Sequence, residues 1–170
     1  LLTLKGYNSI IYFMGKEEKL KGDAFINYNA AQKIGIYIEK DINKADELFK
    51  IADVLVDAIF GTGFSGEPRS DAAQVINKIN NSGKYVISVD IASGVDSETG
   101  HASQVCVNAN ETVSFCMAKV GNMLYPGAEK CGKLTVANIS IPNAVKESMD
   151  IKINAFDLNE AKEILPKRKS

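Results

Sequence analysis

The sequence has a single histidine, His101, and this scarcity excludes several kinds of catalytic site. A metal site built from several histidines is impossible. A Ser-His-Asp triad would have to use this one residue, and the chain has no G-x-S-x-G segment, which carries the nucleophilic serine in many hydrolases. Because His101 lies in the polar stretch 97–103, we interpret it as a solvated loop residue rather than a catalytic one.

The chain also lacks an excess of charge and long apolar runs. Its 170 residues include 20 basic and 21 acidic side chains, for a formal net charge of −1. This balance is unlike the basic footprint of a nucleic-acid-binding protein. No apolar stretch is long enough to cross a bilayer, and no signal peptide is visible. We therefore expect a cytoplasmic protein with no nucleic-acid partner and no membrane association. The basic cluster Lys167, Arg168 and Lys169 is interpreted as a solvated tail or linker.

Cysteines are few and are not arranged as a metal site. Cys106, Cys116 and Cys131 show no C-x-x-C spacing, and their number is odd. This pattern is typical of free thiols buried in a protein from a reducing compartment. With 45% hydrophobic residues, a chain of this length suits one domain with a sizeable core.

What the sequence does contain is one arrangement twice: an apolar run with an Asp at its end, followed by a loop of small residues. The first copy is the run 52–60 with Asp57, followed by 61–66, and the second is 85–90, followed by 91–94. Such a run, bounded by turn residues, predicts a strand buried on both faces. Ligands bind at the carboxyl ends of strands in open α/β sheets, so we expect Asp57 and Asp90 to share one cleft.

Predicted strands alternate with predicted helices along most of the chain. The strands are expected at 7–14, 35–38, 52–58, 85–90, 111–117 and 133–139. The helices are expected at 20–34, 44–50, 71–81 and 158–165. This alternation predicts a doubly wound parallel sheet with helices on both faces. Residues 121–127 are predicted to form a loop, so the last two strands have no helix between them. We expect them at the sheet edge, with one antiparallel pairing as an alternative.

Each candidate site residue has a structural and a functional interpretation. The loop 61–66 follows a strand and precedes a helix, so its N–H groups would suit a phosphate. It matches neither the dinucleotide fingerprint nor a Walker A loop, and an ordinary strand–helix connection explains it equally well. Asp57 and Asp90 would accept N–H bonds from their own loops, or would bind a cation and move a proton. Ser93 offers an oxygen to a hard cation. Lys119 is either a phosphate partner or a surface lysine.

Three segments resemble the YjeF N-terminal domain family, the NAD(P)H-hydrate epimerases: residues 56–66, 88–96 and 131–142. Residues 20–24 and Asn27 add an upstream match. The resemblance implies an α/β fold, a three-layer αβα sandwich with a Rossmann-like, mostly parallel sheet. It also implies an isomerase for metabolite repair. Such an enzyme interconverts the R and S forms of hydrated NADH and NADPH (NADHX and NADPHX) at C6 of the nicotinamide ring.

The resemblance also implies roles for individual residues. Asp57 and Ser93 match potassium ligands, and Asp90 matches the acidic residue beside the reacting ring, which makes it the candidate catalytic residue. Substrate binding is expected from Asp90 and Lys119 together with the loop residues Gly61, Thr62, Gly63, Phe64, Ser65, Gly66 and Glu67.

The chain departs from the family pattern at both ends. The family's first strand and its glycine-rich N-N-G-G-D-G segment would lie before Leu1, and Ala92 stands where the family has proline. The tail 165–170 resembles the junction to a dehydratase domain. We therefore expect residues 1–150 to form an epimerase domain truncated at its N-terminus. Residues 151–170 are expected to form a helix and linker toward a missing ADP/ATP-dependent dehydratase domain. We further expect a homodimer and low activity for the fragment alone.

Two other functions compete with epimerisation. The first is a non-catalytic Rossmann-like module for binding or dimerisation, which the retained Asp57, Asp90 and glycine loop argue against. The second is an ordinary nucleotide-binding oxidoreductase, which the missing dinucleotide fingerprint argues against.

Overall fold

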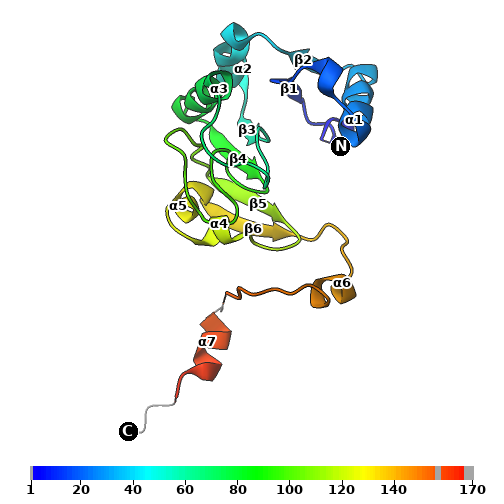
Figure 1. Ribbon diagram of the computed structural model, residues 1–170. Coiled ribbons are helices and arrows are strands. Elements are labelled where there is room, and N and C mark those ends of the chain that lie inside the picture. The colour runs from blue at the N-terminus through cyan, green and yellow to red at the C-terminus, as the bar shows by residue number, and fades with distance from the viewer. Residues whose placement is uncertain (1, 156–157, 167–170) are drawn as a thin grey trace. The chain divides into compact units, whose positions relative to one another are not determined.

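The computed structural model of the protein describes residues 2–155 and 158–166. The backbone divides into two compact units, the first ending at Ala137 and the second beginning at Asn138 (Figure 1). The second unit contains α6 (Asn143–Glu147) and α7 (Leu158–Ile164), which confirms the predicted terminal helix. The expected boundary at residue 150 falls inside this unit, and the linker assignment stays a prediction. The basic cluster at 167–169 lies outside the described residues.

Two parallel sheets form the frame of the first unit. One pairs β1 (Ile10–Tyr12) with β2 (Tyr37–Glu39). The other has four neighbouring strands in the order β3 (Val54–Asp57), β4 (Tyr85–Val89), β5 (Glu111–Phe115) and β6 (Lys133–Ala137). Every pairing between these strands is parallel. The predicted α/β class with a parallel sheet is confirmed, and the alternative of an antiparallel pairing between the last two strands is wrong.

Helices lie between successive strands as far as β4, and parallel neighbours such as β1 and β2 or β3 and β4 need a crossover of this kind. These are α1 (Gly22–Lys33) between β1 and β2, α2 (Ala45–Ile51) between β2 and β3, and α3 (Ser70–Asn81) between β3 and β4. Three short 3-10 helices lie at Thr3–Lys5, Glu17–Lys19 and Ile42–Lys44. The predicted helices at 20–34, 44–50 and 71–81 are confirmed with shifted ends.

Two short helices occupy the segment that was predicted to be a loop between β5 and β6. They are α4 (Val120–Met123) and α5 (Gly127–Cys131). Glycine and proline are poor helix formers, so the sequence shows no helical periodicity here. The turns form because the buried Gly121 and Gly127 let backbone approach backbone. Their N–H groups donate to Ser97 O (2.8 Å) and Gly100 O (2.9 Å).

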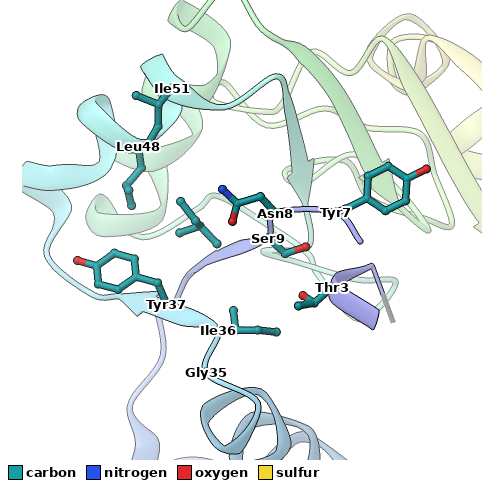
Figure 2. Close-up of a pocket in the computed structure, with 10 residues that line it drawn as sticks. Thr3, Tyr7, Asn8, Ser9, Gly35, Ile36, Tyr37, Leu48 and Ile51 are labelled. Atoms are coloured by element: carbon teal, nitrogen blue, oxygen red, sulfur yellow. The ribbon is translucent and has the colours of Figure 1, made fainter. Parts of the chain in front are cut away.

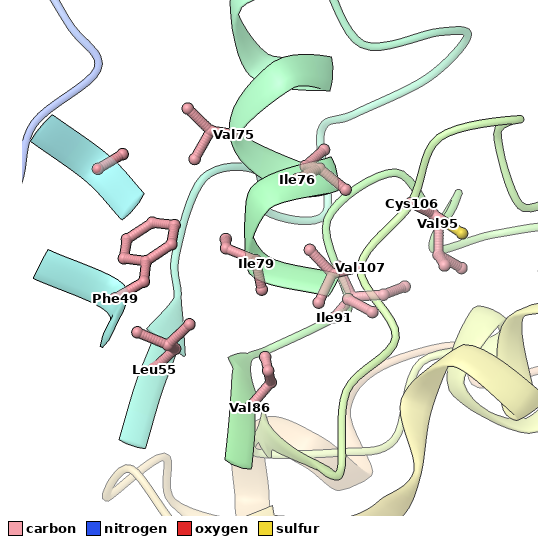
Figure 3. Packing of buried hydrophobic residues seen from close by; sticks show 12 residues of the cluster. Phe49, Leu55, Val75, Ile76, Ile79, Val86, Ile91, Val95, Cys106 and Val107 are labelled. Atoms are coloured by element: carbon pink, nitrogen blue, oxygen red, sulfur yellow. The ribbon is translucent and has the colours of Figure 1, made fainter. Parts of the chain in front are cut away.

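The core lies between α3 and one face of the four-stranded sheet. From α3, Val75, Ile76 and Ile79 pack in one cluster with Leu55 of β3 and Val86 of β4 (Figure 3). The connection after β4 adds Ile91, Ala92, Val95, Cys106 and Val107 to the same cluster. Because so much of the segment 91–107 is buried, the core fixes the loop that carries Ser93.

The opposite face of this sheet carries exposed side chains. Along β3, Leu55 and Asp57 are buried, whereas Val54 is 44% exposed and Val56 is 54% exposed. Tyr85 at the start of β4 is also exposed. The prediction that the strand at 52–58 is buried on both faces is therefore wrong for the described residues. Both faces of the strand carry apolar side chains, so the sequence does not reveal which face is covered.

No helix in the described ranges is long and apolar enough to cross a membrane. The cytoplasmic location stays a prediction. The three cysteines are free, with Cys106 and Cys131 buried and Cys116 partly buried. Burial raises the pKa of the Cys106 thiol above its usual value.

Candidate active site

The strand register brings the carboxyl ends of β3, β4 and β5 together. Asp57 lies opposite Ser88, and Val89 lies opposite Val113. Asp90 follows β4 directly, and its N–H donates to Val113 O at 2.8 Å. The two predicted acidic residues thus end neighbouring strands at one edge of the sheet.

Asp57 is buried, with 1% of its surface exposed. Its carboxylate accepts four hydrogen bonds, from Ser88 Oγ (2.7 Å), Ser93 N (2.9 Å), Ser93 Oγ (2.6 Å) and Ile59 N (3.2 Å). A buried carboxylate is unfavourable unless such donors pair with it. The hydrogen bond from the N–H of Ile59, two residues after Asp57, forms the local turn that the structural interpretation of Asp57 predicts. The other three tie β3 to β4 and to the loop after β4.

Asp57 and Ser93 also have the chemistry of the predicted potassium site. Carboxylate and hydroxyl oxygens are ligands for hard cations, and these two oxygens lie 2.6 Å apart in a buried position. The Ser93 hydroxyl also accepts from Phe60 N at 2.9 Å, so its place is fixed from both sides. The described part of the chain has no group of three His, Cys, Asp or Glu side chains arranged for a metal ion. In donor type the pair fits a hard cation, with other oxygens needed to complete the shell.

Asp90 differs from Asp57 in having one carboxylate oxygen free. Its Oδ1 accepts from Phe115 N (3.0 Å) and from Lys119 Nζ, and Ser114 Oγ lies 3.5 Å away. Within the described residues no donor reaches Oδ2. The side chain is 18% exposed. One oxygen is thus held by the protein while the other can receive a ligand's proton.

The backbone of Asp90 is also unusual. Its φ of 71° lies in the left-handed region, which residues other than glycine rarely adopt. The peptide is held on both sides, since its N–H donates to Val113 O and its carbonyl accepts from Asn122 Nδ2 at 3.2 Å. Such a conformation persists only when the surrounding structure fixes it, and it occurs often at active sites.

Lys119 turns its ammonium group toward Asp90. Besides the ion pair with Oδ1, Nζ donates to Phe115 O (2.8 Å), Ser114 Oγ (3.2 Å) and Met117 O (3.3 Å). Its side chain is 22% exposed. Lys119 is therefore not a free surface lysine, because its ammonium group pairs with the Asp90 carboxylate. A contact from Lys119 to the substrate stays a prediction.

The glycine loop after β3 lies on the surface. Its residues from Gly61 to Glu67 are exposed except Phe64, whose ring stacks on Phe60 with centroids 4.6 Å apart. Of the loop's own N–H groups, only that of Phe64 donates to a protein acceptor in the described structure, to Gly61 O at 3.1 Å. The others are available to an anion, as the phosphate interpretation requires.

Hydrogen bonds attach this loop to the segment 91–107. Ser97 Oγ donates to Thr62 O (2.9 Å), and Ser103 Oγ donates to Gly66 O (2.6 Å). Asp96 organises that segment by accepting from the N–H and hydroxyl of Thr99 and from Glu98 N, which lower the pKa of its carboxyl. His101 is exposed in the same segment, consistent with a solvated loop residue.

A groove of about 460 Å³ lies away from these residues (Figure 2). Its lining includes Ile10 at the start of β1, Ile36 and Tyr37 at the start of β2, and Leu48 and Ile51 of α2. It contains neither aspartate nor the glycine loop. Ligands in open α/β sheets bind at the carboxyl ends of strands, whereas this groove lies at the amino ends of β1 and β2. We therefore place the candidate site at the edge that carries Asp90.

Sequence reasoning missed three polar residues that hold the aspartates: Ser88, Ser114 and Asn122. Ser88 and Ser114 are buried on the same sheet face as Asp57. Each is a small polar residue inside an apolar run. Because every second residue of a strand points to the same face of the sheet, this spacing was the signal that the sequence offered. Asn122 had none, because its partner depends on how α4 packs.

Comparison with known proteins identifies the family. The family model described as "YjeF-related protein N-terminus" matches residues 1–121, more than half of the chain. The chain belongs to the YjeF N-terminal family. The match covers both aspartates, Ser93 and the glycine loop, and it confirms the resemblance drawn from the sequence motifs.

Relatives in this YjeF N-terminal family carry two kinds of name. A Thermofilum pendens protein named "Bifunctional NAD(P)H-hydrate repair enzyme Nnr" is 40% identical over 92% of this chain. A Pirellula staleyi protein named "NAD(P)H-hydrate epimerase" is 32% identical over 88% of this chain and 68% of its own length. The chain spans 30% of the Thermofilum protein and 33% of a bifunctional relative from Moorella thermoacetica.

The YjeF N-terminal fold is also found by structure comparison. The crystal structure of the yeast protein ynu0 matches with a TM-score of 0.66, over 81% of this chain and 56% of that chain. The two sequences are 21% identical, so this likeness supports the fold alone.

Proposed function

We propose that this chain carries the epimerase activity of an NAD(P)H-hydrate repair enzyme, interconverting the R and S forms of NADHX and NADPHX. The single observation that carries the proposal is Asp90, with one carboxylate oxygen held by the protein and the other free, at the sheet edge that also bears the glycine loop. Relatives matched along most of this chain bear the epimerase name, which supports the same reaction. The bifunctional relatives support a parent protein with a fused dehydratase domain.

The chemistry needs a group that moves a proton at the substrate hydroxyl. In hydrated NAD(P)H, C6 of the ring is bonded to the ring nitrogen and to a hydroxyl. Once the hydroxyl is protonated, the nitrogen lone pair can expel it as water, which leaves a planar iminium. Water then adds to either face of C6 and gives up a proton. Ring opening and reclosure is an alternative route. Asp90 Oδ2 would exchange this proton, while Lys119 and Phe115 N hold Oδ1. General acid–base help of this kind contributes about 10²- to 10⁴-fold.

The remaining candidate residues bind rather than react. The exposed N–H groups from Gly61 to Glu67 suit the substrate's phosphates. Asp57 and Ser93 would hold potassium, which supplies a fixed positive charge that anchors the two loops rather than a strong Lewis acid. If so, thermal unfolding in KCl should occur at a higher temperature than in choline chloride of equal ionic strength. Ser93→Ala should abolish that difference, and an equal Tm in both salts for the unaltered protein would refute the potassium proposal.

The test of the reaction uses Asp90→Asn in the full polypeptide that the gene encodes. Epimer interconversion is followed by chromatography from one purified epimer of NADPHX, with Asp46→Asn as the matched control. Asp46 is exposed and pairs with Lys78 on α3, so its loss should leave the rate unchanged. We expect Asp90→Asn to slow interconversion by about 10²- to 10⁴-fold. An unchanged rate would remove Asp90 from the mechanism, and no interconversion by the unaltered protein would refute the proposed activity.

A further inference from the structure

Asn122 has an unusual hydrogen-bonding state. It is 4% exposed, and among the described residues its Oδ1 is the one buried side-chain nitrogen or oxygen atom without a hydrogen-bond partner. Its Nδ2 donates to Asp90 O at 3.2 Å and lies 3.8 Å from Cys131 Sγ. The orientation of the amide follows from the contact with Asp90 O, because a carbonyl oxygen only accepts and so requires the NH₂ group to face it.

Two unfavourable features meet at this contact. A buried amide oxygen without a donor costs free energy, which an apolar side chain of similar size would avoid. The left-handed conformation of Asp90, with φ of 71°, is less favourable than the right-handed one for a residue with a Cβ, although aspartate adopts it more readily than most. Strained backbone and unpaired buried polar atoms often occur where function constrains the structure. Each such group therefore calls for an explanation.

We infer that Asn122 is a positioning residue for Asp90, an inference that rests on the proposed epimerase function. Lys119 precedes α4 and Asn122 lies within it, so one short turn holds Asp90 at two points. The lysine binds the carboxylate at Oδ1, and the asparagine binds the main-chain carbonyl. With the peptide held in the left-handed conformation, the carboxylate stays against Lys119 and Phe115 N, and Oδ2 stays open to the substrate.

Asn80 of α3 provides a matched control. Its Nδ2 also donates to a main-chain carbonyl, Cys106 O at 2.8 Å, and its Oδ1 accepts from Asn108 N at 2.9 Å. Both ends of this amide are therefore satisfied, and it makes no contact with Asp90. Leucine at position 80 leaves two backbone groups without partners. Leucine at position 122 removes one unpaired oxygen, and it frees one carbonyl and the weak sulfur acceptor of Cys131.

The inference predicts a crossed pattern for Asn122→Leu and Asn80→Leu. Asn122→Leu should lower kcat by about 10- to 100-fold, as expected for a small misplacement of a catalytic group, with KM little changed and Tm unchanged or higher. Asn80→Leu should lower Tm and leave kcat unchanged. The opposite pattern, a larger loss of Tm for Asn122→Leu with normal kcat, would show a purely structural role and overturn the inference.

A second measurement separates this inference from the proposed function. The ¹³C chemical shifts of the Asp90 Cα and carbonyl report its backbone conformation without substrate. They should move away from left-handed values in Asn122→Leu and remain unchanged in Asn80→Leu. Unmoved Asp90 shifts in Asn122→Leu would overturn the inference even if the enzyme is active. If the unaltered protein lacks epimerase activity, the proposed function fails, and the shifts alone decide whether Asn122 positions Asp90.

Discussion

Replacing Asp57 by alanine should strongly destabilise the fold. The side chain is 1% exposed and accepts hydrogen bonds from Ser88 Oγ, from both N and Oγ of Ser93, and from Ile59 N. Alanine removes every acceptor at once and leaves these donors facing one another across a buried space. Asp57 therefore links β3 to β4 and to the loop after β4, in addition to being a candidate cation ligand.

The size of the effect follows from the number and type of bonds lost. A hydrogen bond to an ionised acceptor contributes about 1.5–3 kcal/mol, so four bonds set an upper limit of about 6–12 kcal/mol. The two serine hydroxyls can turn toward other acceptors, whereas the N–H groups of Ser93 and Ile59 cannot. Each of these two buried N–H groups left without a partner costs about 1–3 kcal/mol, so we expect a total loss of about 3–5 kcal/mol. For a chain of this length that corresponds to a drop in Tm of roughly 6–20 °C.

Urea unfolding followed by far-ultraviolet circular dichroism measures this loss, since the chain has no tryptophan to report by fluorescence. Asp46→Ala is the control, because Asp46 is 64% exposed in its ion pair with Lys78 and exposed pairs contribute about 0–1 kcal/mol. The loss of stability in Asp57→Asn should lie between those of Asp57→Ala and Asp46→Ala. The amide keeps the shape of the carboxylate but places an NH₂ group against a donor. A loss below about 1 kcal/mol for Asp57→Ala would refute the view that the carboxylate holds the strand ends together.

Two further predictions concern the sheets. Leu55 is buried and its neighbour Val56 is 54% exposed, so Leu55→Ala should cost about 2–5 kcal/mol and Val56→Ala under about 1 kcal/mol; equal losses in urea unfolding would contradict the one-sided sheet. Tyr37 Oη and the N–H groups of Asp41 and Lys40 lower the pKa of the Glu39 carboxyl from 4.5 to about 2. Because the folded pKa lies below the unfolded one, this stabilisation is present above about pH 4.5 and is lost as the pH falls toward 2. Glu39→Gln should flatten the pH dependence of the urea midpoint in that window, and an unchanged slope would contradict it.

The class of fold and the positions of the two aspartates were open to prediction because they depend on local patterns. Apolar runs of strand length alternate with helical spacing, and this alternation alone favours a parallel sheet. Asp57 and Asp90 each come at the end of such a run, so the edge on which they lie follows from the parallel topology. The different roles that the environments of these two aspartates allow could not be predicted from the sequence. Burial of Asp57 and the free oxygen of Asp90 depend on residues far along the chain.

Three features could not be predicted, each for a physical reason. The exposed face of β3 is apolar like the buried one, so the sequence does not show which face α3 covers. The helices α4 and α5 form through close backbone packing at Gly121 and Gly127 and not through helix propensity. The bond from Ser88 to Asp57 requires the register between β3 and β4, which long-range pairing sets.

The exposed side of the four-stranded sheet affects how the chain behaves in solution. Val54, Val56, Tyr85 and Phe115 are exposed on the described sheet, and exposed apolar surface favours association with other apolar surfaces. Because side chains alternate along a strand, a polar replacement at Val56 would improve solubility without disturbing Asp57, whose carboxylate points the other way.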